Sequence, residues 1–171
     1  TSQTADLISS LKATDVIIVG GTAAVSDDVK STIESKEIKV NRIFGNDRTL
    51  TADAIEGEVM KYSTTDTVII CSGQNFPDAL SISPYAYAQK IPILLTGNNG
   101  KLTDASLAIA KGFRNAILVG KEGAVSKDVE TQLSDVSLKR YGGNERYGTS
   151  VEIINNLFSG KPSALAVATG E

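Results

Sequence analysis

Two turns of similar sequence carry the residues in this chain that are best suited to ligand chemistry. Residues 46–48 read Asn-Asp-Arg and residues 144–146 read Asn-Glu-Arg, an offset of 98 positions (144 − 46). Each arginine offers a planar fork of donors that suits a carboxylate or a phosphate group. The candidate ligand-binding residues of these turns are Arg48, Arg146, Asn46 and Asn144.

A second pair of arginines, Arg42 and Arg140, stands one element upstream of these turns, and we include both among the candidates. The alternative reading is that each arginine pairs with the neighbouring acid, or with an adjacent repeat unit, and holds the assembly together. The sequence leaves both readings open. Thr51 and Thr149 follow the turns and are expected to cap the next helix.

The segment SGQNFPDAL at residues 72–80 is a further candidate site. Asn75 and Asp78 bracket a Phe-Pro pair, directly after an apolar strand and before an apolar helix. Open α/β sheets bind ligands at the carboxyl ends of their strands, which makes Asn75 and Asp78 candidate ligand-binding residues. A purely structural reading is equally open, with Asp78 as a helix-start acid and Phe76 as a lid on the core.

The residue types that are missing restrict the chemistry. The chain has no histidine and one cysteine, so a Ser-His-Asp triad, a Cys-His pair, a histidine-liganded metal and an internal disulfide are all excluded within it. Cys71 ends an apolar strand and is expected to be a buried hydrophobic residue. The glycines of VIIVGGTAAVS lack the third glycine of a dinucleotide-binding turn, so they indicate a tight strand-to-helix connection. We expect no enzyme activity, no metal and no cofactor.

Composition and net charge limit the classes of partner that the chain is expected to bind. Hydrophobic residues make up 41% of the 171 positions and charged residues 22%, which is typical of a folded domain. The net charge of −3 argues against nucleic acid as a partner. No apolar run is long enough to span a membrane, and any export signal is expected to lie outside this sequence.

The chain is an internal repeat. Residues 16–29 match residues 116–129 at an offset of 100 (116 − 16), and residues 67–74 match residues 164–171 at an offset of 97 (164 − 67). We therefore divide the chain into a first unit at residues 1–100 and a second, incomplete unit at residues 101–171. The remainder of the second unit is expected to lie elsewhere, for example in a companion chain.

Short β-branched runs alternate with amphipathic stretches throughout. Strands are expected at residues 16–19, 39–44, 67–71, 91–96, 115–120, 138–142 and 164–169, with helices between them. Several runs are apolar throughout, as in parallel strands that are covered on both faces. The pattern predicts an α/β fold with a mainly parallel sheet flanked by helices. Ser26 and Ser126 are expected to be helix N-caps, and Pro84 to kink a helix or start a new one.

The combination of VIIVGGTAAVS, RIFGNDRTLTA, ICSGQNFPDALS and IPILLT, in this order, resembles the clostridial and bacillary cell-wall-binding repeat of the second type. The resemblance covers the whole chain. The second copy, with AILVGKEGAVS and RYGGNERYGTS, is closer to the usual pattern of that family. The first copy departs from it, with Phe44 and Thr49 in place of Gly142 and Tyr147.

This resemblance implies an exported protein with three tandem repeats, folded as Rossmann- or Toprim-like α/β units that pack side by side in a pseudo-threefold assembly. It implies a noncatalytic module that holds a surface or S-layer protein to an anionic polysaccharide of the Gram-positive wall, outside the cell. The implied partners are that polysaccharide, other repeat units of the same protein or of a companion chain, and other S-layer proteins.

Two other readings compete with this one. In the first, the chain is a structural assembly module whose repeats mainly bind each other or other surface proteins. In the second, it is a sugar- or nucleotide-modifying enzyme on a doubly wound sheet, which the missing histidine and the incomplete phosphate fingerprint disfavour.

Overall fold

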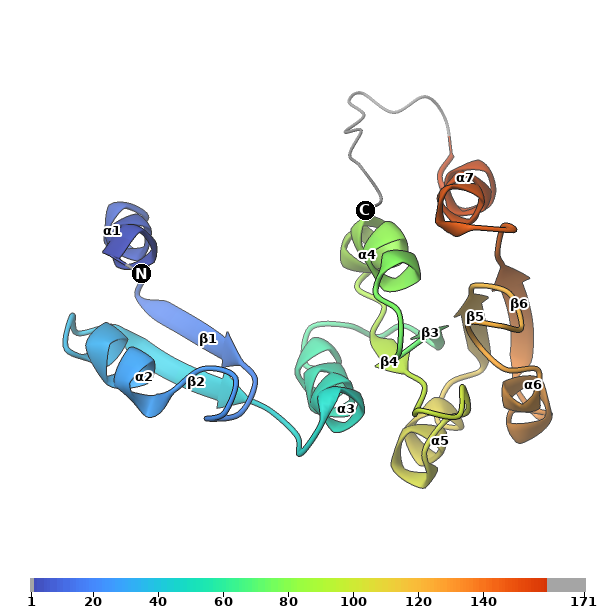
Figure 1. Cartoon of the computed structure of the whole chain (residues 1–171), viewed down its shortest axis with the longest axis horizontal. Coiled ribbons are helices and arrows are strands. Elements are labelled where there is room, and N and C mark those ends of the chain that lie inside the picture. Colours follow the sequence, from blue (N-terminus) through green and yellow to red (C-terminus); the bar gives the residue numbers. More distant parts are fainter. Residues whose placement is uncertain (1, 160–171) are drawn as a thin grey trace.

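The computed structural model describes residues 2–159, which form helices and parallel strands in regular alternation (Figure 1). In chain order the elements are α1 (Ser2–Ser10), β1 (Asp15–Val19), α2 (Asp27–Glu34), β2 (Lys39–Ile43), α3 (Arg48–Val59), β3 (Thr67–Cys71), α4 (Pro77–Gln89), β4 (Ile93–Leu95), α5 (Asp104–Ala110), β5 (Asn115–Val119), α6 (Asp128–Gln132), β6 (Ser137–Tyr141) and α7 (Arg146–Leu157). The six strands predicted within these residues are all present, and the α/β fold is confirmed. The strand predicted at residues 164–169 lies outside the described residues.

The strands form two separate parallel sheets. The smaller sheet pairs β1 with β2, and the larger has the order β4-β3-β5-β6. Strand β3 pairs with β4 along one edge and with β5 along the other. The larger sheet therefore contains strands from both sides of residue 100. The division at that residue describes the sequence repeat and stays a prediction for the domain boundary.

The larger sheet is buried on both faces because side chains alternate along its strands. One face packs with α5 and α6, and its central side chains are Val68, Ile70, Leu94, Ala116 and Leu118. The other face packs with α4 and α7, and its side chains are Ile69, Cys71, Ile117 and Val119. Cys71 is fully buried, as the sequence predicts.

The smaller sheet has a core on one face only. Ile18 of β1 packs there with Ile33 and Ile38 from α2 and the turn that follows it. Helix α3 then leaves this sheet and packs on β4 and α5 of the larger one. At that contact the Ser106 hydroxyl donates to the Asp53 carboxylate, with both carboxylate oxygens at 2.9 Å. Burial raises the pKa of Asp53, and the Ser106 hydrogen bond opposes that rise.

Two local predictions were wrong in detail. Helix α4 does not restart at Pro84 but runs through it. Ile82 and Ala86 on either side are buried in the core, and this packing stabilises a helix that continues past the missing backbone donor, while the alternative of a kink at Pro84 stays a prediction. Ser126 is not the N-cap of α6, because Lys127 holds that position and the helix begins at Asp128; the Ser126 hydroxyl still accepts from Asp128 N. Ser26 occupies the N-cap position of α2 as predicted, without a side-chain hydrogen bond.

None of the helices in residues 2–159 is long and apolar enough to cross a membrane.

Candidate functional site

The acid and the threonine of each repeated turn are used to build the turn. Asp47 is the N-cap of α3 and accepts from Leu50 N at 2.8 Å, while Thr51 Oγ1 accepts from Gly45 N at 2.9 Å. The expectation that Thr51 caps the helix was therefore wrong, because the acid four positions earlier holds the cap. Such a cap contributes about 1 kcal/mol to helix stability.

The second copy repeats this arrangement. Glu145 is the N-cap of α7 and accepts from Tyr147 N at 2.7 Å and Gly148 N at 2.8 Å. Thr149 Oγ1 accepts from Gly143 N at 3.1 Å, so this side chain stabilises the turn and does not cap the helix. The acids are engaged with backbone donors in both copies, so each has a structural role in its turn.

The glycine that precedes the asparagine in both turns, Gly45 and Gly143, has a steric reason. A Cβ on Gly45 would lie 2.4 Å from the carbonyl carbon of Leu50, and a Cβ on Gly143 would lie 2.2 Å from that of Gly148. Both distances are far shorter than any normal contact. The first turn of the helix thus packs directly on the backbone of the glycine, and this explains why both copies have glycine there.

Arg42 and Arg140 lie inside the strand-to-helix connections of their own units. Arg140 Nη1 donates to Gly120 O at 2.8 Å and to Val125 O at 2.9 Å, and its Nε and Nη2 bind Glu130. Arg42 makes the same pair of backbone contacts 100 positions earlier, both at 2.8 Å, and an ion pair with Asp27 at 3.2 Å. These contacts give both arginines a clear structural role, and ligand binding by them stays a prediction.

Arg48 and Arg146 are different, because both are exposed and both meet the segment that follows β3. Arg48 Nη1 donates to Gly73 O at 2.9 Å. Arg146 lies close enough to Asp78 for its charge to lower the pKa of that carboxyl. The two arginines of the repeated turns therefore approach the same β3–α4 connection, at its beginning and at its end.

Asp78 lies in the first turn of α4 and is only half-buried. Burial is the largest influence and raises the pKa of Asp78, while a hydrogen bond with Thr149 and the charge of Arg146 oppose the rise. A Cβ on Gly120 would lie 2.5 Å from Asp78 Oδ2, so the carboxylate reaches across to the end of β5. The sequence suggested a first-turn acid, but not this contact between repeats.

The remaining polar candidates lie exposed around this connection. Asn46, Asn75 and Asn144 all have exposed side chains. Asn144 accepts a hydrogen bond from the exposed ammonium group of Lys121, a residue that the sequence reading missed. The sequence reading also missed Gln74, whose side chain donates at 2.7 Å to Asn98, a residue of the loop after β4. Phe76 is 67% exposed and is not a lid on the core.

Apart from Arg42 and Arg140, the candidate residues all follow the carboxyl ends of parallel strands, where open α/β sheets bind ligands. We define the strand-end site by its two exposed arginines, its three exposed asparagines and Asp78. The arrangement provides cationic forks and amide groups for an oxygen-rich, anionic partner. Cys71 supplies no nucleophile, because burial raises the pKa of its thiol far above the usual range. Among residues 2–159 no cluster of three or more potential metal ligands is present.

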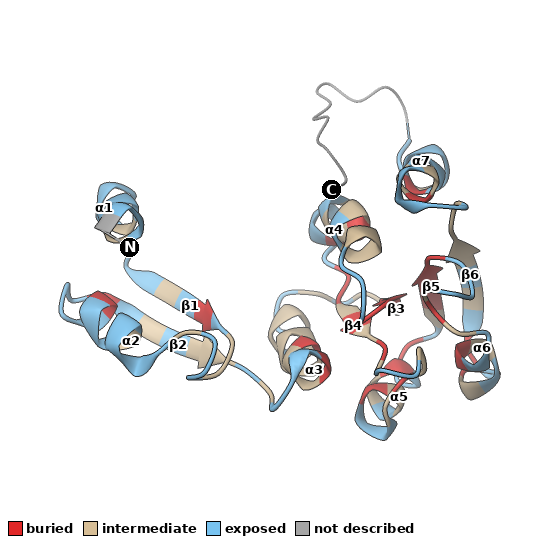
Figure 2. Ribbon diagram, viewed as in Figure 1, coloured by how far each residue is buried: buried red, intermediate tan, exposed pale blue. Residues whose placement is uncertain are grey.

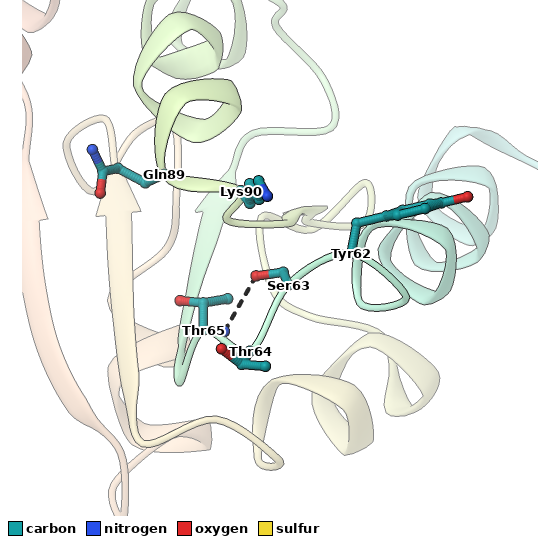
Figure 3. A pocket seen from close by; sticks show the side chains of 6 residues that line it. All are labelled: Tyr62, Ser63, Thr64, Thr65, Gln89 and Lys90. Atoms are coloured by element: carbon teal, nitrogen blue, oxygen red, sulfur yellow. Dashed lines mark hydrogen bonds between the residues drawn. The ribbon is translucent and has the colours of Figure 1, made fainter.

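A surface hollow lies at the opposite end of the larger sheet, between the chain entering β3 and the end of α4 (Figure 3). It is lined by Tyr62, Ser63, Thr64, Thr65, Gln89 and Lys90. Within it the Ser63 hydroxyl accepts from Thr65 N at 3.2 Å, which folds the loop onto itself. Lys90 is the one charged side chain in this lining, so the hollow offers less chemistry than the strand-end site.

The comparisons with known proteins decide the family. Residues 42–130, more than half of the chain, match the model of cell wall binding domain 2 (CWB2). The chain belongs to this family. It is a cell-wall-binding module, and the family places it at the cell surface or outside the cell.

Relatives with known structures or names agree with this assignment. The fold superimposes on Cwp8 from Clostridium difficile with a TM-score of 0.78 and 31% identity, over 86% of this chain and 25% of that one. The sequence is 35% identical to the amidase enhancer of Bacillus subtilis (strain 168), over 84% of this chain and 19% of the relative. It is 31% identical to the N-acetylmuramoyl-L-alanine amidase LytC of the same organism, over 91% and 30%. The chain thus spans less than a third of each of these proteins.

Proposed function

We propose that this CWB2 module binds an anionic secondary polysaccharide of the Gram-positive cell wall through the strand-end site, and so holds a surface or S-layer protein noncovalently to the wall. The observation that carries the proposal is the convergence of Arg48 and Arg146 on one loop. Arg48 binds Gly73 O at 2.9 Å, and Arg146 lies beside Asp78.

The acids near these arginines also have structural roles. Asp47 and Glu145 cap the following helices, and burial raises the pKa of Asp78. The proposal places the exposed arginines on a local surface of a chain whose net charge is −3, since local potential depends on where the charges lie. Several such sites on one rigid body would bind a repeating polymer with greater avidity than any single site.

The relatives support a role outside catalysis for this module. LytC is named as an N-acetylmuramoyl-L-alanine amidase, and this chain matches 30% of its length. The amidase enhancer and Cwp8 share the same module within longer chains. We infer that the module anchors and that other parts of such proteins act.

Co-sedimentation with purified Gram-positive walls tests the proposal. One half of the walls is stripped of its anionic secondary polymer beforehand, and binding is measured at low and at high salt. The proposal requires binding that is lost on stripping and weakened by salt, because salt screens exposed charges. Equal binding to stripped walls would reject the polysaccharide as the ligand.

One observation favours a second function, in which the module mainly assembles with other repeats. The hydrogen bonds between Ser106 and Asp53 connect the two repeats, because Asp53 belongs to the first unit and Ser106 to the second. If charge-removing changes at Arg48 and Arg146 leave wall binding intact but disrupt the packing of the repeats, the assembly function is the better description.

A further inference from the structure

Lys121 has no side-chain counterpart in the first copy of the repeat. It stands two residues after the end of β5, and the equivalent residue after β1, at an offset of 100 (121 − 21), is Gly21. Residues 121–123 are exposed, and Figure 2 shows the β5–α6 connection partly in pale blue beside the largely red β5. The second strand end therefore carries an exposed cation at a position where the first carries no side chain.

The side chain of Asn144 holds the ammonium group of Lys121. Asn144 Oδ1 accepts a hydrogen bond from Lys121 Nζ, and an ammonium group can only donate, so this bond also fixes which way round the amide lies. The NH₂ group of Asn144 is thereby left as a donor, and it makes no hydrogen bond within residues 2–159. Two neighbouring side chains thus present N–H donors, one of them cationic.

The charge of Lys121 is not taken up by an ion pair. No carboxylate in the part of the chain that the structure describes pairs with it, whereas Lys101 of the same unit pairs with Asp128 at 2.7 Å. Its partner is the neutral amide of Asn144. Hydrogen bonds from an ammonium group to a phosphate or carboxylate are stronger than those between neutral groups. The Lys121 ammonium group can therefore bind an anionic ligand without first breaking an ion pair.

The backbone after β6 explains why nothing covers this lysine from that side. A Cβ on Gly142 would lie 2.6 Å from Lys121 N, so the two backbones are in direct contact and residue 142 places no side chain over the lysine. In the first copy Phe44 takes the place of Gly142, at an offset of 98 (142 − 44). Its ring lies over Gly21, because a Cβ on that glycine would lie 3.4 Å from Phe44 Cδ2. The two copies thus exchange a glycine and a side chain between the same two positions.

Asn46, the counterpart of Asn144 at an offset of 98 (144 − 46), has no such lysine beside it. Its side chain makes no hydrogen bond within the described residues, so no bond fixes its amide. The ring of Phe44, which is 53% exposed, stands at this strand end instead of a cation. Donors that are already held in place bind more tightly than donors that must be ordered on binding. The first strand end thus lacks both the charge and the fixed amide of the second.

We propose that Lys121 and Asn144 form an oxyanion-binding pair that takes a phosphate or carboxylate group, and that the second copy of the turn binds this group in preference to the first. The inference rests on the proposed wall-binding function for the source of that group, an anionic wall polymer. It makes Lys121 a determinant of specificity that distinguishes two otherwise similar turns.

Titration of the ¹⁵N-labelled full chain, followed by NMR, tests the pair. The probes are inorganic phosphate and galacturonate, a sugar with one carboxylate, each at constant ionic strength. Saturable shifts are expected for the backbone amides of residues 120–122 and 143–145 and for the side-chain amide of Asn144. The equivalent residues 20–22 and 45–47 should shift at least several-fold less. A response to one probe alone identifies the preferred anion, whereas no saturable response to either, or equal responses in the two copies, overturns the proposal.

Matched variants separate the pair from general electrostatics. Lys121→Gln removes the charge but keeps a long side chain with a donor, and it should weaken binding of the responding probe at least several-fold. Lys127→Gln removes one charge from an exposed position of the same unit and should leave binding unchanged. The double variant Gly21→Lys/Phe44→Gly gives the first copy the residues of the second and should add saturable shifts at residues 45–47. Native binding by Lys121→Gln, equal weakening by both glutamine variants, or a folded double variant without the added shifts would overturn the proposal.

The free anions report on the pair and not on the wall. A chain that binds them as expected but does not bind walls would reject the proposed function and keep this inference. A chain that binds walls but shows no preference of the anions for the second copy would reject this inference alone.

Discussion

Arg48 Nη1 lies 2.9 Å from the carbonyl oxygen of Gly73, and this hydrogen bond connects a turn of the smaller sheet to the end of a strand in the larger one. Arg146, in the same position of the next repeat, lies beside Asp78 at the far end of the same connection. One loop is thus approached by the equivalent arginine from two successive repeats. This relationship makes the strand-end site a property of neighbouring repeats together, and not of either alone.

The contacts of the half-buried Arg140 side chain predict a large loss of stability when it is removed. Arg140→Ala deletes two hydrogen bonds to backbone carbonyls and the ion pair with Glu130. We expect the free energy of unfolding to fall by about 2–3 kcal/mol, since bonds to charged groups are strong and the carbonyls lose their partner. Urea denaturation measures this. The neighbouring exposed variant Lys139→Ala should change it by no more than about 0.5 kcal/mol. Equal effects of the two changes would contradict the structural role.

Replacing each of two glycines with alanine should change the stability of the chain in opposite directions. Gly143→Ala would place a Cβ 2.2 Å from the Gly148 backbone and should destabilise the chain by about 2 kcal/mol or more. Gly57→Ala lies in α3 with nothing within 4 Å and should stabilise it by about 0.5–1 kcal/mol, because alanine is the better helix former. Thermal or urea unfolding of both variants checks the pair. A loss of stability in Gly57→Ala would show that the helix is more tightly packed than described.

The repeat itself supplies a matched pair of substitutions. Ile117→Asp buries an unpaired charge and should lower the free energy of unfolding by about 4 kcal/mol or more, or prevent folding. Ile17→Asp, at the equivalent exposed position, should lower it by about 1 kcal/mol or less. The comparison uses urea unfolding followed by circular dichroism. Similar large losses at both positions would mean that β1 is already covered in the isolated chain.

The pH dependence of Asp78 has a definite sign. Burial raises the pKa of Asp78 in the folded chain above its ordinary value of 3.8, so the folded state holds the proton more tightly than the unfolded state. The ionised carboxylate therefore disfavours folding above the raised pKa, and this penalty fades as the pH falls through it towards 3.8. We expect Asp78→Asn to be more favourable to stability, relative to the native chain, at pH 7 than at pH 4.

Urea unfolding of the native chain and Asp78→Asn at both pH values measures that difference. The opposite trend, with asparagine less favourable at pH 7, would show that Arg146 and Thr149 outweigh burial and hold the pKa of Asp78 below its usual range.

Much of the fold followed from residue patterns. The run TVIIC predicted both ends of β3 correctly. A strand that is covered on both faces is apolar almost throughout, so the apolar run and the strand have the same bounds. The pairing of β3 with β5 was not predictable, because a repeat gives the number of equivalent strands but not which repeat each strand joins. For the same reason, the sequence did not predict that Ile17 and Val19 of β1 are exposed.

The site was predicted less completely than the fold. The arginine and asparagine turns were found because they recur, but the sequence could not separate half-buried Arg42 from exposed Arg48. Both have the same side chain close to the same turn, and the two backbone carbonyls that Arg42 binds are contacts that the sequence does not reveal. The sequence reading missed Lys121 because this residue lies in a glycine-rich turn, and the glycines indicated only a tight strand-to-helix connection.

The most direct test of wall anchoring through the strand-end site is co-sedimentation of the double variant Arg48→Gln/Arg146→Gln with Gram-positive walls that retain their anionic polymer. The matched control is Lys127→Gln/Lys139→Gln, which removes the same charge from exposed positions elsewhere. With both variants folded, the account predicts at least a tenfold weaker binding of the arginine variant and nearly native binding of the control. Native binding by the arginine variant, or equal weakening of both, would contradict it.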